Sequence, residues 1–326
     1  MRRRPVLAGL AAFLASAPAL AQGTAKRVGV LMGYGQADAG AGDDVAGLVQ
    51  GLAALGWKES ANIHVEWRWA AGDPVLFERH AVELAALQPD VLIAQGTPSL
   101  KALRPKAGAI PIIFTIVTDP VGQGFVENLA HPGGTITGFT DFDPSMAGKW
   151  LQMLTETRPA VSRALVLYNP DTAPFAGTMI RAIQETAPSF GVTALAAPCH
   201  DAGAVEAAFA DNARDTGGGV IVLPDLFNLV NRNAIVASAE RHRLPVVYFN
   251  RTFTIAGGLM SYGVDYAEQF RNAAGYVDRL LKGAHATDLP VQQPDKFDLS
   301  INLKTARALG IEIAPTTVAL ADDVIE

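Results

Sequence analysis

The chain has 326 residues, of which 49% are hydrophobic and 18% are charged, and its formal net charge is −6 at pH 7. That length suits two packed domains rather than one. An acidic balance without a basic patch argues against a nucleic-acid-binding protein. The one cysteine, Cys199, cannot form an internal disulfide, and we interpret it as a small packing residue.

Residues 1–21 have the layout of a secretory signal peptide. Three arginines at positions 2–4 precede an apolar run over residues 6–15, and Ala19-Leu20-Ala21 supplies a small-x-small cleavage site. The apolar run is too short for a stable membrane anchor. We therefore expect cleavage after Ala21 and a protein free in the periplasm, by the Sec or the twin-arginine route. Loss of the three arginines would take the formal charge from −6 to −9.

The mature chain begins with an alternation of strand-like and helix-like segments. "RVGVLM" (27–32) is a continuous apolar run, and a helical spacing follows the acidic pair Asp43-Asp44. "NIHVEWRW" (62–69) alternates as a half-covered strand does, and Asp73-Pro74 opens the next helix as N-cap and first-turn proline. "DVLIAQG" and "IPIIFTIVTDP" are two further strands. This alternation predicts a parallel α/β unit.

The alternation of strands and helices begins again after the turn-rich stretch "HPGGTITGF" (131–139), with a helix that begins near Ser145. "RALVLYNP", "GVTALAA", "GGVIVLPD" and "LPVVYFN" are the strands of a second unit. A helix from Asp265 to Leu281 and a further extended stretch and helix come after that unit is complete. We therefore predict two doubly wound lobes between which the chain crosses several times. Lobe I would take residues 26–140 and about 263–289, and lobe II residues 141–262 and about 290–326.

Catalytic and metal-binding patterns are absent from the sequence. There is no Walker-type loop, no His-Glu-x-x-His helix, no Gly-x-Ser-x-Gly elbow and no Ser-x-x-Lys arrangement. Gly33 and Gly35 match the first two glycines of a dinucleotide fingerprint, but Asp38 stands in place of the third. None of the six histidines lies at metal-ligand spacing from another histidine or from Cys199, except His200, which directly follows that cysteine and is too close to make a site by itself. We expect no catalytic set, no metal and no cofactor.

Polar and aromatic residues gather instead at the predicted carboxyl ends of strands, where open parallel sheets bind their ligands. Hydroxyls and helix N-terminal amides could hold a carboxylate, Asp119 or Asp225 an ammonium, and aromatic rings the body of a small zwitterion or apolar acid. The alternative is that the aspartates are helix caps and the tyrosines packing residues. The predicted ligand-binding residues are Gly33, Tyr34, Thr97, Ser99, Thr118, Asp119, Asn169, Asp225, Tyr248 and Tyr262.

The stretch "GGLMSYGVDY" (257–266) could be the corner of an active site or a hinge. Ser261 has no base beside it in sequence, so a nucleophile is not expected. Glycine gives backbone freedom just before the helix that should return to the first lobe. We predict a hinge made of Phe139, Tyr262, Gly263 and Pro290.

Long segments of the chain resemble a known family. They are "HPGGTITGF", "LPDLFNLVNR", "AERHRLPVVYFNRTFTIAGGLMSYGVD" and the run that starts "AGYVDRLLKGAHATDLPVQQPDKFDLSINLKTARALGIEI". The chain is similar there to ABC-transporter substrate-binding proteins of the tryptophan/tyrosine type, over residues 26–326. The resemblance implies a type I periplasmic binding-protein fold with three crossovers, and an ABC permease and ATPase as partners. It leaves the ligand open, since characterised members bind aromatic amino acids and others have no assigned substrate.

We therefore predict a monomeric periplasmic receptor that closes around a small ligand, an amino acid or related carboxylate, and delivers it to an importer. One alternative is a sensor that presents its closed form to a membrane receptor. Another is a cleft hydrolase, against which the missing general base argues.

Overall fold

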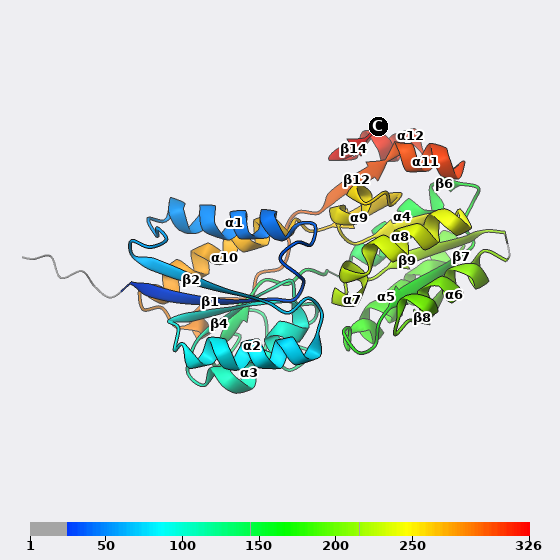
Figure 1. Ribbon diagram of the computed structural model, residues 1–326. Coiled ribbons are helices and arrows are strands. Elements are labelled where there is room, and N and C mark those ends of the chain that lie inside the picture. Colours follow the sequence, from blue (N-terminus) through cyan, green and yellow to red (C-terminus); the bar gives the residue numbers. More distant parts are fainter. Residues whose placement is uncertain (1–24, 144, 215) are drawn as a thin grey trace, which may run out of the picture.

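The computed structural model describes residues 25–143, 145–214 and 216–326. The predicted signal peptide lies outside these residues. Two lobes lie side by side (Figure 1), each built on its own sheet. The predicted α/β class with two parallel-sheet lobes is confirmed.

The first lobe contains a five-stranded sheet in the order β2-β1-β3-β4-β5, all parallel. Helices α1 and α10 cover one face, and α2 and α3 cover the other (Figure 1). Asp73 accepts a hydrogen bond from the Val75 amide at 2.8 Å, as the predicted N-cap of α2. The elements are β1 (Lys26–Met32), α1 (Ala41–Ala54), β2 (Ile63–Trp69), α2 (Pro74–Ala86), β3 (Val91–Gln95), α3 (Gly96–Ala107), β4 (Ile112–Thr115), β5 (Ile136–Gly138), and, from late in the chain, α10 (Tyr266–Leu281) and η2 (Ala286–Asp288).

The second lobe contains a seven-stranded sheet in the order β14-β12-β11-β10-β9-β7-β8. Only the β11–β12 pair in it is antiparallel. Its elements are α4 (Ser145–Thr155), β6 (Thr157–Arg158), β7 (Arg163–Tyr168), α5 (Ala176–Thr186), η1 (Ala187–Phe190), β8 (Thr193–Pro198), α6 (Ala202–Asn212), β9 (Gly218–Val222), α7 (Leu226–Val230), α8 (Arg232–His242), β10 (Val246–Tyr248), α9 (Arg251–Ile255), β11 (Met260–Gly263), β12 (Asp298–Asn302), α11 (Leu303–Leu309), β13 (Glu312–Ile313), α12 (Pro315–Ala319) and β14 (Asp323–Ile325).

The chain passes between the two sheets three times: after β5, after β11 and before β12. The first and third crossovers run side by side, since Thr140 N donates to Gln292 O at 2.9 Å and Gln292 N donates to Gly138 O at 2.9 Å. The hydroxyl of Tyr276 on α10 donates to the carbonyl of Pro290 at 2.5 Å. These bonds tie the first lobe to two of the three connections.

The second crossover passes very close to the end of β10. A Cβ on Gly263 would lie 1.7 Å from the carbonyl oxygen of Phe249, so no side chain fits there. Trp150 of α4 is fully buried, and its Nε1 donates to the carbonyl of Tyr262 at 2.8 Å. The predicted hinge residues therefore all lie on or beside the crossovers, while their role in closure and the lobe boundaries stay predictions.

Candidate ligand-binding cleft

The carboxyl ends of strands from both lobes meet in a small cavity, which we call the inner pocket. The first lobe contributes residues after β3, β4 and β5, and the second contributes residues after β7, β9 and β10. The lining residues are Gln95, Gly96, Thr97, Pro98, Ile116, Thr118, Asp141, Thr172, Phe175, Pro224, Asp225, Leu226, Leu229, Phe249 and Tyr266. None of these described residues is a lysine or arginine. The cavity holds about 30 Å³, so admission of a ligand requires the lobes to move apart.

Asp225 lines the inner pocket from the second lobe. It follows β9 and caps α7, where its Oδ1 accepts from the Phe227 amide at 3.0 Å and from the Thr172 hydroxyl at 2.5 Å. Its Oδ2 accepts from the Asn169 amide at 2.8 Å. Burial raises the pKa of Asp225 to about 6, although these three hydrogen bonds oppose the rise. The carboxylate is thus held in place with part of its charge uncompensated.

Asp141 lines the inner pocket from the first crossover. Its Oδ1 accepts from the Thr118 hydroxyl at 2.7 Å, and no hydrogen bond from another described residue reaches its Oδ2. The side chain is 4% exposed. Burial raises the pKa of Asp141 to about 6. A free oxygen on a buried carboxylate suits a cationic ligand group.

The end of β4 is strained at this point. Ile116 and Asp119 both have positive φ angles, 58° and 48°, a backbone conformation that residues other than glycine rarely adopt. The Ile116 amide donates to Oε1 of Gln269 on α10 at 2.9 Å, and Nε2 of Gln269 donates to the Thr140 carbonyl at 2.8 Å. Gln269 thereby fixes the strand end relative to the first crossover, and with it the pair Thr118–Asp141.

The first residues of helix α3 line the inner pocket. Its N-cap Gln95 offers no side-chain cap to the first amides of the helix, because its Oε1 accepts from the Gly33 amide at 2.7 Å. The first-turn residue Thr97 is 5% exposed. Amides at the start of a 12-residue helix attract a carboxylate. Phe175, Phe249 and Tyr266 add aromatic walls.

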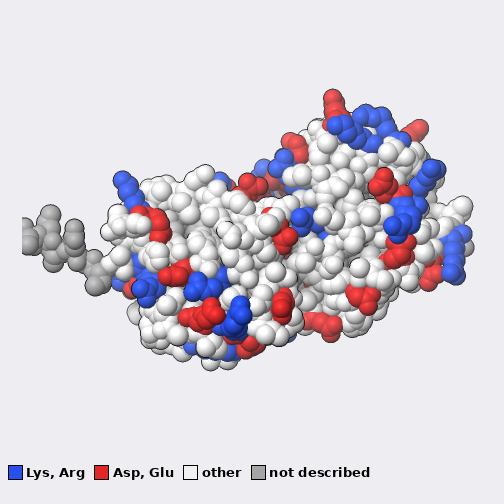
Figure 2. All heavy atoms as spheres, in the orientation of Figure 1, with Lys and Arg blue, Asp and Glu red and all other residues white. Residues whose placement is uncertain are grey.

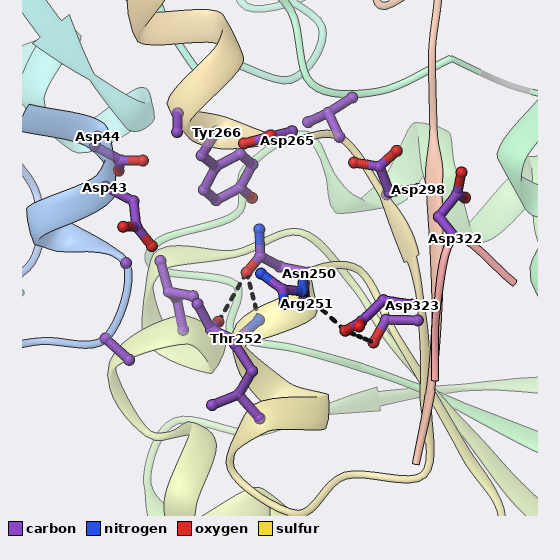
Figure 3. A pocket seen from close by; sticks show the side chains of 18 of the residues that line it. Asp43, Asp44, Asn250, Arg251, Thr252, Asp265, Tyr266, Asp298, Asp322 and Asp323 are labelled. Carbon is purple, nitrogen blue, oxygen red and sulfur yellow. Dashed lines mark hydrogen bonds and ion pairs between the residues drawn. The ribbon is translucent and has the colours of Figure 1, made fainter. Parts of the chain in front are cut away.

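A second cavity of about 380 Å³, which we call the outer chamber, adjoins the inner pocket, because Tyr266 and Leu229 line both. Figure 3 shows Asp43 and Asp44 of α1 on one side of it, Tyr266 at the start of α10, and Asn250, Arg251 and Thr252 opposite. Asp298, Asp322 and Asp323 complete it near the C-terminus. Charged side chains also appear in the hollow between the lobes in Figure 2.

The structure brings together five of the ten predicted ligand-binding residues. Thr97, Thr118 and Asp225 line the inner pocket, Tyr34 lines the outer chamber, and Gly33 lies where a Cβ would meet Gln95 at 2.8 Å and Leu226 of the other lobe at 3.2 Å. Their role as ligand contacts stays a prediction.

The other five predicted residues, like Gly33, line neither cavity. Asp119 turns away and accepts from the Gly122 amide at 2.9 Å. Tyr248 stacks on Phe253 inside the second lobe with ring centroids 4.7 Å apart. Ser99 is buried within α3, Asn169 supports Asp225, and the ring of Tyr262 packs on Phe297.

Several lining residues were not predicted from the sequence. Asp44 was interpreted as part of a helix start, and Asp141 lies in a stretch interpreted as the junction between units. Phe175 precedes α5 with no polar neighbour to mark it. The usable signal was the position of Asp141 at a predicted connection between the lobes, since such connections absorb the movement that closes a cleft. The described residues contain no group of three His, Cys, Asp or Glu side chains able to hold a metal ion.

Comparison with known proteins agrees with this architecture. A curated relative, the "Tyrosine-binding protein" of Clostridioides difficile, is 25% identical over 267 residues, which cover 82% of this chain and 76% of that protein. A conserved domain protein of Vibrio cholerae is 28% identical, with a TM-score of 0.84 over 93% of this chain and 100% of that one. A Streptococcus pneumoniae ABC domain in complex with L-Trp has the same TM-score and coverage at 23% identity, which shows the shared fold. The family model of ABC transporter substrate binding proteins matches residues 38–325, and the chain belongs to this family.

Proposed function

We propose that this protein is the ligand-binding subunit of an ABC importer, and that it captures an amino acid between its lobes in the periplasm. The family assignment excludes the cleft hydrolase considered from the sequence, since this is a family of binding proteins. No helix in the described part of the chain is long and apolar enough to cross a membrane. A permease and an ATPase would then be its partners, and a monomer would suffice for capture.

The observation that carries the amino-acid proposal is the pair of buried aspartates in a pocket without a cationic side chain. Asp141 lines the inner pocket from the first crossover, and Asp225 lines it from the second lobe. An ammonium group that reaches either one recovers part of the cost of burying it. The start of α3 would take the carboxylate, and the aromatic and aliphatic walls would enclose the side chain. The relatives named for tyrosine and L-Trp support this ligand class.

Amino acids and analogues that lack one charged group test the proposal. The mature protein is titrated with L-tryptophan, L-tyrosine, L-leucine, L-lysine and L-arginine. The amino acid that binds is then compared with its analogue without the carboxylate and its analogue without the α-ammonium, which for tryptophan are tryptamine and indole-3-propionate. We expect binding of at least one amino acid and a loss of at least tenfold in affinity when either charged group of that ligand is removed. Binding of no amino acid would refute the proposal, and equal binding of the truncated ligands would refute the roles of Asp141, Asp225 and α3.

Transport is tested in cells. Deletion of the gene should abolish uptake of the identified radiolabelled amino acid, and restoration of the gene should return it. Unchanged uptake with a ligand that binds would favour the sensor alternative over the importer.

A further inference from the structure

The outer chamber is lined by more acidic side chains than basic ones. Six aspartates line it, against Arg251 and Lys296. Arg251 pairs with Asp323 at 3.0 Å, and Lys296 pairs with Asp298 at 2.6 Å. The remaining aspartates have no ion pair within the described part of the chain. An excess of four carboxylates gives the chamber a negative potential.

One of these carboxylates is buried without a partner. Asp44 is 2% exposed, and no hydrogen bond or ion pair among the described residues involves its side chain. In Figure 3 it points from α1 into the chamber. Burial, and then the nearby charge of Asp265, raise its pKa well above the ordinary value. A buried carboxyl that nothing in the protein satisfies costs stability, and a cationic ligand group would offset that cost.

A second buried polar group in the chamber also lacks a partner. The hydroxyl of Tyr34 makes no hydrogen bond, and the residue is 2% exposed. Tyr266 stands between the two cavities, and its pKa is raised by burial and then by Asp141 and Asp44. The aromatic ring of Tyr266 therefore lies between a carboxylate of the inner pocket and a carboxylate of the outer chamber, where a cation can contact its face.

We propose that the outer chamber is a second subsite of the ligand cleft, which takes the ammonium or guanidinium end of a basic amino acid. The proposal rests on the proposed function. The α-amino and α-carboxylate groups occupy the inner pocket, the methylene stem passes Tyr266 and Leu229, and the cationic end reaches Asp44. A volume of about 380 Å³ is within the range of small-molecule sites.

The experiment compares basic amino acids with L-norleucine, which has the carbon chain of lysine but lacks its terminal ammonium group. The dissociation constants of L-lysine, L-arginine and L-norleucine are measured by titration calorimetry for the wild-type protein, for Asp44→Asn and for Asp211→Asn. Asp211 is the control, because its side chain is 67% exposed at the end of α6 and lines neither cavity. We expect lysine or arginine to bind at least tenfold more tightly than norleucine. Asp44→Asn should erase that preference, and Asp211→Asn should change it by less than threefold.

The other outcomes refute either the subsite or the proposed function. Norleucine binding as tightly as lysine and arginine would refute the subsite and leave the proposed function standing. A preference for lysine that survives Asp44→Asn would place the cation elsewhere and also refute the subsite. Binding of no amino acid at all would refute the proposed function itself. Folding is not limiting, because asparagine has a similar shape and the Asp44 side chain makes no hydrogen bond or ion pair among the described residues that the substitution would break. We expect the melting temperature of Asp44→Asn to be no lower than that of the wild type.

Discussion

Asp141→Asn should make the ligand-free protein more stable and its ligand binding weaker. Burial raises the pKa of Asp141 from 3.8 to about 6, so ionisation at pH 7.5 costs the native state about 3 kcal/mol at most. Asparagine keeps the shape and can still accept the Thr118 hydroxyl. We therefore expect the free energy of unfolding to rise by about 1–3 kcal/mol. The same change removes the proposed partner of the ligand ammonium, which should cost about 2 kcal/mol of affinity, or roughly 30-fold.

Calorimetry measures both effects on one preparation. Differential scanning calorimetry of the ligand-free protein gives the stability change, and isothermal titration with the amino acid identified above gives the affinity change. Asp211→Asn is the control, since that side chain is 67% exposed at the end of α6. It should alter neither quantity measurably. An Asp141→Asn protein that is less stable at pH 7.5, or that binds the amino acid as tightly as the wild type, would contradict the reasoning.

The pH dependence follows from the same two carboxyls, and two packing predictions accompany it. Because the pKa values of Asp141 and Asp225 rise to about 6 on folding, the native state binds more protons than the unfolded chain between about pH 4 and 6. The destabilisation that their ionisation causes therefore falls as the pH is lowered from 7.5 to 5, and the affinity for the amino acid falls as well. Melting and titration experiments on the wild type and on Asp141→Asn isolate the contribution of Asp141. A difference between the two proteins that does not change with pH would count against this prediction. Gly263→Ala should lower the free energy of unfolding by more than about 2 kcal/mol in denaturant unfolding, because its Cβ would overlap the Phe249 carbonyl. Gly275→Ala in α10 is the control: its Cβ meets nothing within 4 Å, and it should stabilise the protein by about 0.5–1 kcal/mol. Equal effects of the two substitutions would exclude the close approach of Gly263 to Phe249. Trp150→Phe leaves a crossover carbonyl without its donor and should cost about 1–3 kcal/mol in the same assay, and an unchanged midpoint would show that water replaces the bond.

The strand-end rule brought five of its ten predicted residues to or beside the two cavities, and local geometry explains why the other five lie elsewhere. Thr118 and Asp119 are adjacent, yet only Thr118 faces the pocket, because Asp119 has a φ of 48° and its carboxylate closes a turn instead. Tyr248 ends β10 with its ring in the core, and the next residue, Phe249, reaches the pocket. For Thr118 and Asp119, the side chain that faces the pocket depends on one backbone angle, and no hydrophobic pattern records that angle.

Asp141 and Asp44 could not be located by the same rule for a different reason. Neither directly follows a strand end: Asp141 lies on the first crossover, and Asp44 lies in the first turn of α1. Asp44 faces residues of the second lobe across the outer chamber only because the lobes are placed against each other. Leu226 of α7 packs against the core of the first lobe, and Thr252 of α9 lies near Gly40 at the start of α1. The sequence predicts each lobe from local periodicity. The relative position of the lobes depends on such contacts between segments far apart in the chain.

The proposed ligand contacts and the predicted hinge lie on the same segments of the chain. Asp141 lies on the first crossover, and Tyr266 begins the helix that follows the second. Gln269, one turn further along α10, holds both the Thr140 carbonyl and the strained Ile116 amide. Gln269 therefore keeps the Asp141–Thr118 pair with the first lobe when the lobes move, and the movement changes the position of this pair relative to Asp225 on the second lobe. A ligand that contacts both carboxylates favours the closed arrangement by its differential affinity for that arrangement. The buried charge that weakens the ligand-free protein is, on this reasoning, the group through which the ligand drives closure.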